Sequence, residues 1–387
     1  MKRLKYVKAV VFCLMIGCIS MMISGCTGGK TVEDKSNLAL VDSMDLQYAT
    51  QFSVDYYEDN YVHIHIADDR DYVLVPTGEK ENNLGYSDVT YIHEDEMKQS
   101  IYLAASSAMD LFLQLNQLDV IKTCSTTADD YSMDEVKTAI SDGKIIYVGK
   151  YSAPDYETLL AEDTGLAIES TMIYHSPKIQ EELENIGIPV LIERSSYEET
   201  PLGRLEWIKL YGVLLGCEEE ATSYFDTQVT KVEALSEELG RQTQENTLSV
   251  AFFYISSNGY VNIRKPGDYL SKMIETAGGK YAFSELELDE ENALSTVNIN
   301  WEDFYKEAKD ADILIYNGTI DGGVSSISQL EEKNALFSDF KAVKSGEVYC
   351  TNMNMFQESS KIADIIRDFH SVVTGDTDNL QYLKKLE

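Results

Sequence analysis

Basic residues are scarce in this chain of 387 residues. Lysine and arginine together number 32, against 66 aspartates and glutamates, so the formal net charge at pH 7 is −34. Only six arginines follow residue 25. A surface with so much negative charge repels the phosphates of nucleic acids and of anionic lipids. The composition therefore excludes nucleic-acid binding and adsorption of the folded body to a membrane surface.

Cysteine is also sparse, and the usual catalytic signatures are missing. Beyond residue 26 the sequence has Cys124, Cys217 and Cys350, an odd number at wide spacings and without a C-x-x-C pair. This pattern excludes a disulfide framework, so we expect three buried single thiols. The sequence contains neither G-x-S-x-G nor H-E-x-x-H, and we predict no catalytic residue and no enzymatic activity.

The long apolar run of the sequence lies near its N-terminus. Residues 1–8 carry four basic side chains, the run AVVFCLMIGCISMMI follows, and Ser24-Gly25-Cys26 closes the segment. This order is typical of a signal peptide, and Ile23 to Cys26 resembles the bacterial lipobox, whose cysteine is lipidated. We predict a lipoprotein signal peptide over residues 1–25, lipidation of Cys26 and a polar tether over residues 26–45. A signal peptide cut nearby without lipidation and a retained anchor are the alternatives. Removing residues 1–25 takes away four positive and no negative side chains, so the net charge becomes −38.

Short aromatic and β-branched runs between residues 46 and 75 predict a hairpin or small meander. His63 and His65 belong to one of these strands, YVHIHIA, and therefore project to the same face. Two such histidines can bind a metal, but no third ligand stands at a matching spacing. We interpret them as part of a solvated strand face.

Two α/β blocks flank one long helix in the rest of the chain. Short apolar strands alternate with helices in residues 100–215 and again after residue 248, which predicts parallel sheets with ligands at the carboxyl ends of the strands. The apolar positions between the blocks have helical spacing: Ala221, Phe225, Val229, Val232, Leu235 and Leu239. We predict an α/β protein of two Rossmann-like lobes, residues 46–217 and 242–387, joined by a single helix over residues 218–241, with the ligand cleft between the lobes.

Several segments resemble the substrate-binding lipoproteins of bacterial ABC importers for ferric siderophores, haem and cobalamin. They are YSAPDYETLL, GLAIESTMIYHSP and PLGRLEWIKLYGVLLG within residues 151–216, and INWEDFYKEAKDADILIYNG at residues 299–318. The resemblance implies an extracytoplasmic receptor, lipid-anchored to the cell membrane, that delivers a chelated iron or cobalt complex to an ABC permease dimer with a cytoplasmic ATPase. It also implies a monomer without a cofactor or metal site of its own. The first 70 residues after the signal peptide have no clear counterpart in compact members of the family.

By position in the family, the resemblance places ligand-binding residues on both lobes. The implied residues of the N-terminal lobe are Ser106, Ser107, Tyr151, Ser152, Ser170, Thr171, Tyr174, Arg194, Ser195, Ser196 and Tyr197, and those of the C-terminal lobe are Tyr254, Arg264, Asn317, Thr351 and Met353. Tyrosine rings with one polar end suit a large and partly polar ligand. Arg194 and Arg264 are two of the six arginines, and a cationic pair facing the cleft suits an anionic ferric chelate or a haem propionate.

The family also carries one exposed glutamate per lobe at the start of a helix, and the pair docks into arginine pockets of the permease. The matching residues here are Glu157 in PDYE and Glu302 in NWED. One carboxylate on each lobe reports the spacing of the lobes, and pairs of arginine and carboxylate are directional.

Three alternatives stay open at this point. The first is a receptor for a free divalent metal ion such as zinc or manganese, with His63, His65, His93 or His175 as ligands. The second is a surface enzyme on the same scaffold, which would show turnover or an acid–base pair in the cleft. The third is a sensor lipoprotein, which would bind its ligand without needing Glu157 or Glu302.

Overall fold

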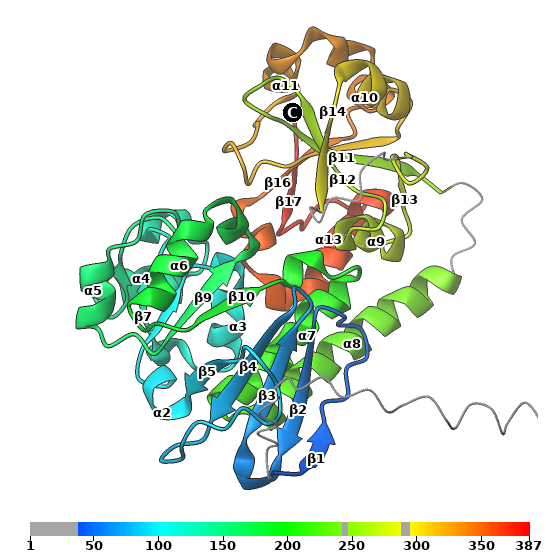
Figure 1. Ribbon diagram of the computed structural model, residues 1–387. Coiled ribbons are helices and arrows are strands. Elements are labelled where there is room, and N and C mark those ends of the chain that lie inside the picture. Colours follow the sequence, from blue (N-terminus) through cyan, green and yellow to red (C-terminus); the bar gives the residue numbers. More distant parts are fainter. Residues whose placement is uncertain (1–37, 242–246, 288–294) are drawn as a thin grey trace, which may run out of the picture. The chain divides into compact units, whose positions relative to one another are not determined.

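The computed structural model describes residues 38–241, 247–287 and 295–387. The predicted signal peptide, Cys26 and most of the predicted tether lie outside these residues. The described chain contains three β-sheets, which we call sheets A, B and C (Figure 1). None of the described helices combines the length and the apolar character that crossing a bilayer requires.

Sheet A is formed by the N-terminal residues and has the strand order β1-β2-β3-β4-β5. Its first four strands pair antiparallel and β5 joins β4 in parallel. The strands are β1 (Leu40–Ser43), β2 (Phe52–Tyr57), β3 (Val62–Ile66), β4 (Arg70–Val75) and β5 (Thr90–His93). Since β1 pairs with β2, the tether predicted up to residue 45 ends before Leu40.

Sheet B is the parallel sheet of the N-terminal lobe, with the order β10-β9-β6-β7-β8. Its strands are β6 (Ile101–Leu103), β7 (Ile121–Cys124), β8 (Ile146–Tyr147), β9 (Leu166–Ser170) and β10 (Val190–Glu193). The helices that accompany it are α2 (Glu94–Met97), α3 (Met109–Gln114), α4 (Asp134–Ser141), α5 (Tyr156–Ala161) and α6 (Pro177–Asn185). Apolar side chains of β6, β9 and β10 are buried on both faces of the sheet, as parallel strands require.

Helices α7 (Pro201–Leu215) and α8 (Glu218–Arg241) follow sheet B. All 15 residues of α7 are buried, because sheet A and α8 both pack on it. A side chain at Gly212 would meet Ala221 Cβ at 2.7 Å, so this glycine allows the two helices to approach closely. Helix α8 has the range expected for the bridging helix, and Ala221, Phe225 and Val232 on its inner face are buried.

Sheet C belongs to the C-terminal lobe and has the order β14-β12-β11-β15-β16-β17, with β13 paired to β11. Strands β11, β13, β15 and β16 are parallel, whereas β12 and β17 run against them. The strands are β11 (Ser249–Ile255), β12 (Val261–Arg264), β13 (Lys280–Tyr281), β14 (Thr296–Ile299), β15 (Ile313–Tyr316), β16 (Val348–Thr351) and β17 (Leu383–Lys385). The helices are α9 (Tyr269–Thr276), α10 (Trp301–Ala308), α11 (Ile327–Lys333), α12 (Lys341–Ser345) and α13 (Ile362–Thr374).

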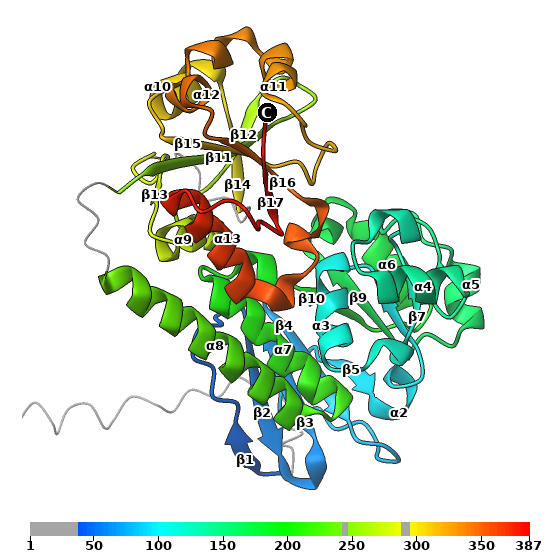
Figure 2. The same ribbon diagram turned by 180° about the vertical axis from the view of Figure 1, so that it is seen from behind.

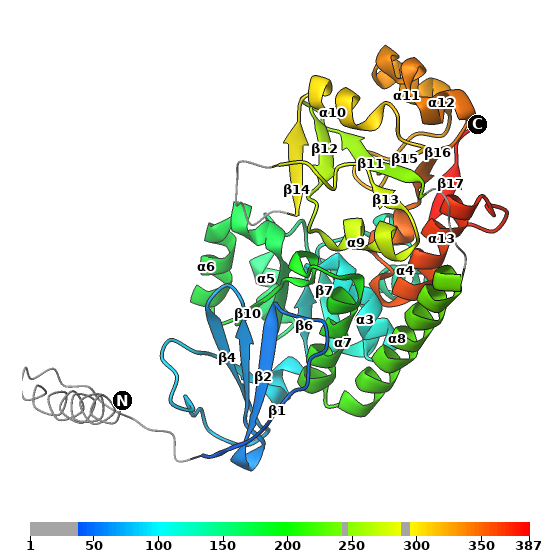
Figure 3. The same cartoon turned by 90° about the vertical axis from the view of Figure 1, so that its right-hand side faces the viewer.

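The chain returns from the C-terminal lobe to the N-terminal lobe near its end. Helix α13 lies against α8 (Figure 2), and Tyr224 of α8 donates a hydrogen bond to the carbonyl of Ser360, just before α13. Sheet A stands beside α7 and α8 (Figure 3). The predicted architecture, two α/β lobes joined by one long helix, is confirmed, and sheet A is an addition to the N-terminal lobe. The prediction of single buried thiols is also confirmed for Cys124, Cys217 and Cys350.

Candidate functional site

The two lobes meet where segment 352–361 leaves β16 and reaches the N-terminal lobe. Ser359 Oγ donates to the carbonyl of Ser107, which follows β6, at 2.7 Å. Gln357 donates to the carbonyl of Asp130 and accepts from the amide of Ser132, both beyond the end of β7, at 2.7 Å each. Loops at the carboxyl ends of sheet B thus face the carboxyl end of β16. We call this region the seam, meaning the loops that follow β6 to β10 and those that follow β11, β15 and β16.

Arg194 lies on the N-terminal side of the seam, directly after β10. Its Nη1 donates to Tyr174 Oη at 2.6 Å and its Nη2 to Gln51 Oε1 at 3.2 Å. The guanidinium carbon lies 4.5 Å from the centre of the Tyr197 ring. Arg194 is 8% exposed, and its Nε is buried without a hydrogen-bond partner among the described residues. A buried N–H without a partner costs free energy.

Asp68 connects this arginine to sheet A. Tyr174 Oη donates to Asp68 Oδ2 at 2.7 Å, and Arg70 Nε lies 3.1 Å from the same oxygen. Burial, together with the hydrogen bond to Asp68, raises the pKa of Tyr174 to about 12, so its hydroxyl keeps its proton at neutral pH. One carboxylate therefore stands between the guanidinium groups of Arg70 and Arg194, and the cluster keeps a positive charge in a strongly acidic protein.

The predicted small polar residues divide into two groups. Thr171 Oγ1 and Ser196 Oγ are 3.5 Å apart, Ser170 Oγ accepts from the amide of Met172, and Ser195 is buried beside Arg194. The structure therefore brings together seven predicted residues at the ends of β9 and β10: Ser170, Thr171, Tyr174, Arg194, Ser195, Ser196 and Tyr197. The loop residues Ser106 and Ser107 lie at the middle strand, and Tyr151 and Ser152 follow β8 at the opposite edge of sheet B.

The C-terminal side of the seam is closed by polar contacts within its own loops. Asn317 and Thr351 are buried, and their side chains lie 3.4 Å apart. Thr351 Oγ1 also accepts from the amide of Gly318, and Asn317 Oδ1 accepts from Thr319. These two predicted residues hold the ends of β15 and β16 together. Tyr254 in β11 is half-buried.

Large apolar side chains are exposed beside the ends of three strands. Met172, Ile320 and Met353 follow β9, β15 and β16, and their exposed fractions are 48%, 60% and 47%. Exposed apolar residues of this size mark binding surfaces when they gather in one region. Both lobes thus offer apolar contact at the seam, while the charge comes from Arg194.

Arg264 has different surroundings from those expected. Because β12 runs against β11, Arg264 lies level with the middle of β11 and not at its carboxyl end. Its Nη1 donates to Ser295 Oγ at 3.0 Å and lies 3.6 Å from Asp268 Oδ2. Arg264 therefore has a carboxylate partner of its own, and its guanidinium carbon also lies 5.2 Å from the centre of the Phe356 ring in segment 352–361.

A second arginine, Arg204 of α7, was not anticipated as a contact between the lobes. It donates a hydrogen bond to Tyr269 Oη of the C-terminal lobe, and its guanidinium carbon lies 4.7 Å from the centre of that ring. The Arg264 guanidinium lies 5.6 Å from the same ring. The scarcity of arginine in the sequence was a signal that pointed to Arg204, but only the fold shows its partner.

Glu169 in β9 is a buried acid close to the seam. It is fully buried, and neither carboxylate oxygen has a hydrogen-bond partner among the described residues. Burial raises its pKa from 4.5 to about 8. Because the folded protein binds this proton more tightly than the unfolded chain does, Glu169 is protonated in the folded protein at pH 7.

This proton predicts a specific dependence of stability on pH. The free energy of unfolding should fall between pH 4.5 and pH 8, as the unfolded chain releases a proton that the folded protein keeps. Residue 169 of the Glu169→Gln variant cannot titrate. The free energy of unfolding of this variant, relative to that of the wild type, should therefore rise by roughly 3–4 kcal/mol from pH 5 to pH 8. Urea unfolding of both proteins at the two pH values measures this difference, and equal pH slopes would show that Glu169 is ionised in the folded protein.

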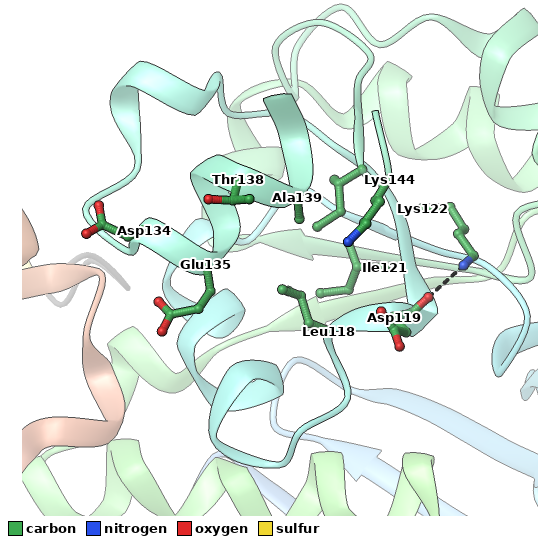
Figure 4. Close-up of a pocket in the computed structure, with 10 residues that line it drawn as sticks. Leu118, Asp119, Ile121, Lys122, Asp134, Glu135, Thr138, Ala139 and Lys144 are labelled. Carbon is green, nitrogen blue, oxygen red and sulfur yellow. Dashed lines mark hydrogen bonds between the residues drawn. The ribbon is translucent and has the colours of Figure 1, made fainter. Parts of the chain in front are cut away.

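One surface pocket, with a volume of about 590 Å³, lies at the other end of sheet B (Figure 4). Leu118, Asp119 and Ile121 line it at the start of β7, Lys144 lines it before β8, and Glu135 lines it from α4. These residues mark the amino ends of parallel strands, whereas ligands of open α/β sheets bind at the carboxyl ends. The pocket therefore does not belong to the seam.

The histidines of sheet A form a compact cluster without the features of a metal site. Asp71 Oδ1 lies 2.8 Å from His63 Nε2 and 2.9 Å from His65 Nδ1, so both rings lie on one face as predicted. The interpretation of a solvated face is wrong for His63, which is 4% exposed and stacks on Tyr86 at 3.7 Å. Among the described residues no group of three or more histidine, cysteine or acidic side chains is arranged to hold a metal ion.

Glu157 and Glu302 both occupy the first turn of a helix and are exposed. Asp155 caps α5 by accepting from the amides of Glu157 and Thr158, and Asn300 caps α10 by accepting from the amide of Asp303. Helix α5 follows β8 of sheet B and α10 follows β14 of sheet C, so each lobe presents one of the two carboxylates.

Comparison with known proteins gives matches in sequence and in structure. Residues 104–354 match the family described as periplasmic binding protein. An uncharacterized lipoprotein of Methanocaldococcus jannaschii is 28% identical over 242 residues, which are 62% of this chain and 55% of that protein. The chain thus matches only about half the length of this relative.

Two solved structures share the fold at low sequence identity. A periplasmic heme-binding protein of Pseudomonas aeruginosa has a TM-score of 0.60 and 14% identity, over 75% of this chain and 98% of that one. An ABC-type Fe3+-hydroxamate transport protein of Saccharomonospora viridis has a TM-score of 0.55 and 17% identity, over 71% of this chain and 92% of that one.

Proposed function

Because the chain belongs to the periplasmic binding protein family, whose members bind solutes and are not enzymes, we propose that it is the extracytoplasmic receptor of an ABC importer. The receptor captures a chelated metal complex in the seam and delivers it to the permease. The observation that carries this proposal is the position of Arg194 at the carboxyl ends of β9 and β10, nearly buried and with no carboxylate in direct contact among its described partners.

The chemistry of the seam favours an anionic ferric chelate or haem over a neutral ligand. Arg194 has tyrosine and glutamine as hydrogen-bond partners and no carboxylate in direct contact among its described partners. Guanidinium groups bind the oxygens of carboxylates and other oxyanions through directional hydrogen bonds. Exposed Met172, Ile320 and Met353 suit the apolar body of a large chelate. A corrinoid is the remaining candidate within the same class.

The N-terminal sequence supports the proposed location of the protein, and Glu157 and Glu302 support its proposed partners. Lipidation of Cys26 would hold the receptor at the outer side of the cell membrane, because the acidic body has no attraction to anionic lipids. Glu157 and Glu302 would dock one receptor monomer onto a permease dimer that is driven by a cytoplasmic ATPase.

Removing both glutamates should block delivery without affecting capture. The double variant Glu157→Ala/Glu302→Ala should lower ligand uptake by cells about tenfold or more, since each substitution leaves an arginine of the permease without its partner. Binding of the ligand to the purified variant should stay within about twofold of the wild type. Glu135→Ala, another exposed glutamate in the first turn of a helix, is the matched control. Normal uptake both by the double variant and by cells that lack the protein would favour the sensor lipoprotein instead.

The receptor role itself is tested by titrating the purified protein while its tyrosine and tryptophan fluorescence is recorded. The titrants are a ferric tris-catecholate, a ferric tris-hydroxamate, haem and cobalamin. Saturable quenching by one class at submicromolar concentration supports the proposal and names the substrate. A response to zinc or manganese alone would replace it by the free-metal receptor, for which the described residues offer no ligand cluster.

A further inference from the structure

Sheet A is fixed to the N-terminal lobe by the residues between β1 and β2. Glu206 of α7 accepts hydrogen bonds from the amides of Tyr48 and Ala49 at 2.7 and 2.8 Å. Glu198 accepts from the amides of Thr50 and Gln51 at 2.8 and 3.0 Å. Both carboxylates are buried. The backbone at Gln51 is therefore held by the same lobe that carries Arg194.

The turn between β3 and β4 is fixed next to this backbone. The amide of Ala67 donates to the carbonyl of Gln51 at 3.0 Å, and Asp69 has a φ of 63°, a left-handed conformation that closes the three-residue turn. The side chains of Gln51 and Asp68 consequently approach the end of β10 from the same end of sheet A, where β2 begins and where β3 turns into β4. This end of sheet A lies outside residues 104–354, the part of the chain that matches the family.

Two side chains at this end of sheet A determine how the Arg194 guanidinium is oriented. Gln51 accepts a hydrogen bond from Nη2 of Arg194. Tyr174 accepts one from Nη1 and donates its own hydroxyl proton to Asp68. Nη1 and Nη2 thereby each use one of their two N–H groups, and Nε has no hydrogen-bond partner among the described residues. These two contacts fix the plane of the guanidinium and use only two of its five N–H groups, so donors remain for an oxyanion.

We propose that sheet A is part of the ligand site, with Gln51 and Asp68 as positioning residues that hold the Arg194 guanidinium in the orientation in which it binds an anionic oxygen of the chelate. This inference rests on the proposed function, including its anionic substrate, and adds the role of sheet A in binding that substrate. Each catecholate group is a dianion, so three of them around ferric iron give a complex with a net negative charge. Each hydroxamate is a monoanion, so three of them give a neutral complex. The site should therefore prefer a ferric tris-catecholate, or the carboxylates of haem, to a neutral ferric tris-hydroxamate.

The effect of removing Asp68 separates positioning from simple electrostatics. Asp68 is an anion near the site, so its loss would strengthen binding of an anionic ligand if only charge mattered. If Asp68 holds Tyr174 and thereby Arg194, its loss should weaken the same binding. The sign of the change in affinity therefore decides between the two roles.

The experiment measures dissociation constants of the full chain and of its variants for a ferric tris-catecholate and a neutral ferric tris-hydroxamate. Asp68→Ala and Tyr174→Phe should each weaken the catecholate about tenfold and change the hydroxamate by less than about twofold. Asp68→Asn should restore most of the affinity, because its amide oxygen still accepts from Tyr174. Tyr156→Phe is the matched control, since Tyr156 donates to the carboxylate of Glu182 at 2.6 Å elsewhere on the lobe.

The other results each overturn the inference in a recognisable way. Tighter catecholate binding by Asp68→Ala would mean that Asp68 acts only through its charge. Unchanged binding by both Asp68→Ala and Tyr174→Phe would mean that the two residues have only a structural role. A wild type that binds the neutral chelate but not the catecholate contradicts the anionic substrate while keeping the receptor role. A wild type that binds none of these chelates, haem or cobalamin fails the proposed function, and the inference falls with it. Thermal melting of each variant confirms that a loss of affinity is not a loss of folding.

Discussion

Replacing Arg194 by methionine should weaken binding of an anionic ferric chelate by about tenfold to a hundredfold, the usual worth of a hydrogen bond to a charged group. Methionine fills a similar volume, so the Tyr174 and Asp68 pair can stay in place while the cation is lost. The positive charge of the cluster disappears with it, since Arg70 already pairs with Asp68 at 3.1 Å. Fluorescence titration or calorimetry of the variant with a ferric tris-catecholate measures the loss.

The chain offers a close control for this substitution. Arg367→Met makes the same chemical change at an exposed arginine of α13, and its affinity should match that of the wild type. Equal affinities of the Arg194 and Arg367 variants would show that Arg194 is a structural residue, and the charge preference would then have to come from another group.

The Glu206→Ala variant should lose about 3–5 kcal/mol of unfolding free energy, as is typical when one partner of a buried ion pair is removed. Glu206 is fully buried, lies 2.7 Å from Lys209 Nζ, and also accepts from backbone amides of residues 47–49. Alanine leaves both the ammonium group and these amides without their partner in the core. Urea unfolding measures the loss.

Glu219→Ala, at an exposed position in the first turn of α8, should change stability by less than about 0.5 kcal/mol. A loss below about 1 kcal/mol in Glu206→Ala would mean that water or another donor replaces the carboxylate, since burial without partners costs more than this. Sheet A would then be held chiefly by apolar contacts such as Phe52 with Trp207, whose ring centres are 5.0 Å apart.

The long helix and the parallel sheets could be predicted because their signals are local. The four- and seven-residue spacing of Ala221, Phe225 and Val232 identifies one face of α8, and the structure buries that face. Short apolar strands that end in small polar residues likewise predicted the ends of β9 and β10. Each of these patterns depends on residues that are close in sequence.

The charged residues of α7 show where such reasoning ends. Arg204, Glu206 and Lys209 stand in an otherwise apolar helix, and all three are buried. Apart from the ion pair between Glu206 and Lys209, their partners lie far away in the sequence. Spacing within the helix does not reveal residues 45–49 or Tyr269 as those partners. The same limit hid the contact of Asp68 with Tyr174, which spans more than one hundred residues.

The corrections have equally physical reasons. His63 is buried because the loop after β4 places Tyr86 over its ring, which the alternation of the strand does not foresee. Arg264 could not be placed from the sequence because its position relative to the seam depends on the direction of β12. A strand pattern gives the residues of a strand but not whether it runs with or against its neighbours.

Hydrogen–deuterium exchange of the full chain, with and without the chelate that binds in titration, tests most directly that the ligand lies in the seam. The account predicts slower exchange in loops of both lobes at once: residues 104–108, 170–175 and 194–198 on one side, and 317–323 and 352–356 on the other. Sheet A should be protected at residues 50–51 and 67–69, next to Arg194. Protection confined to the pocket of Figure 4, at residues 118–122 and 134–145, or to one lobe alone would contradict it.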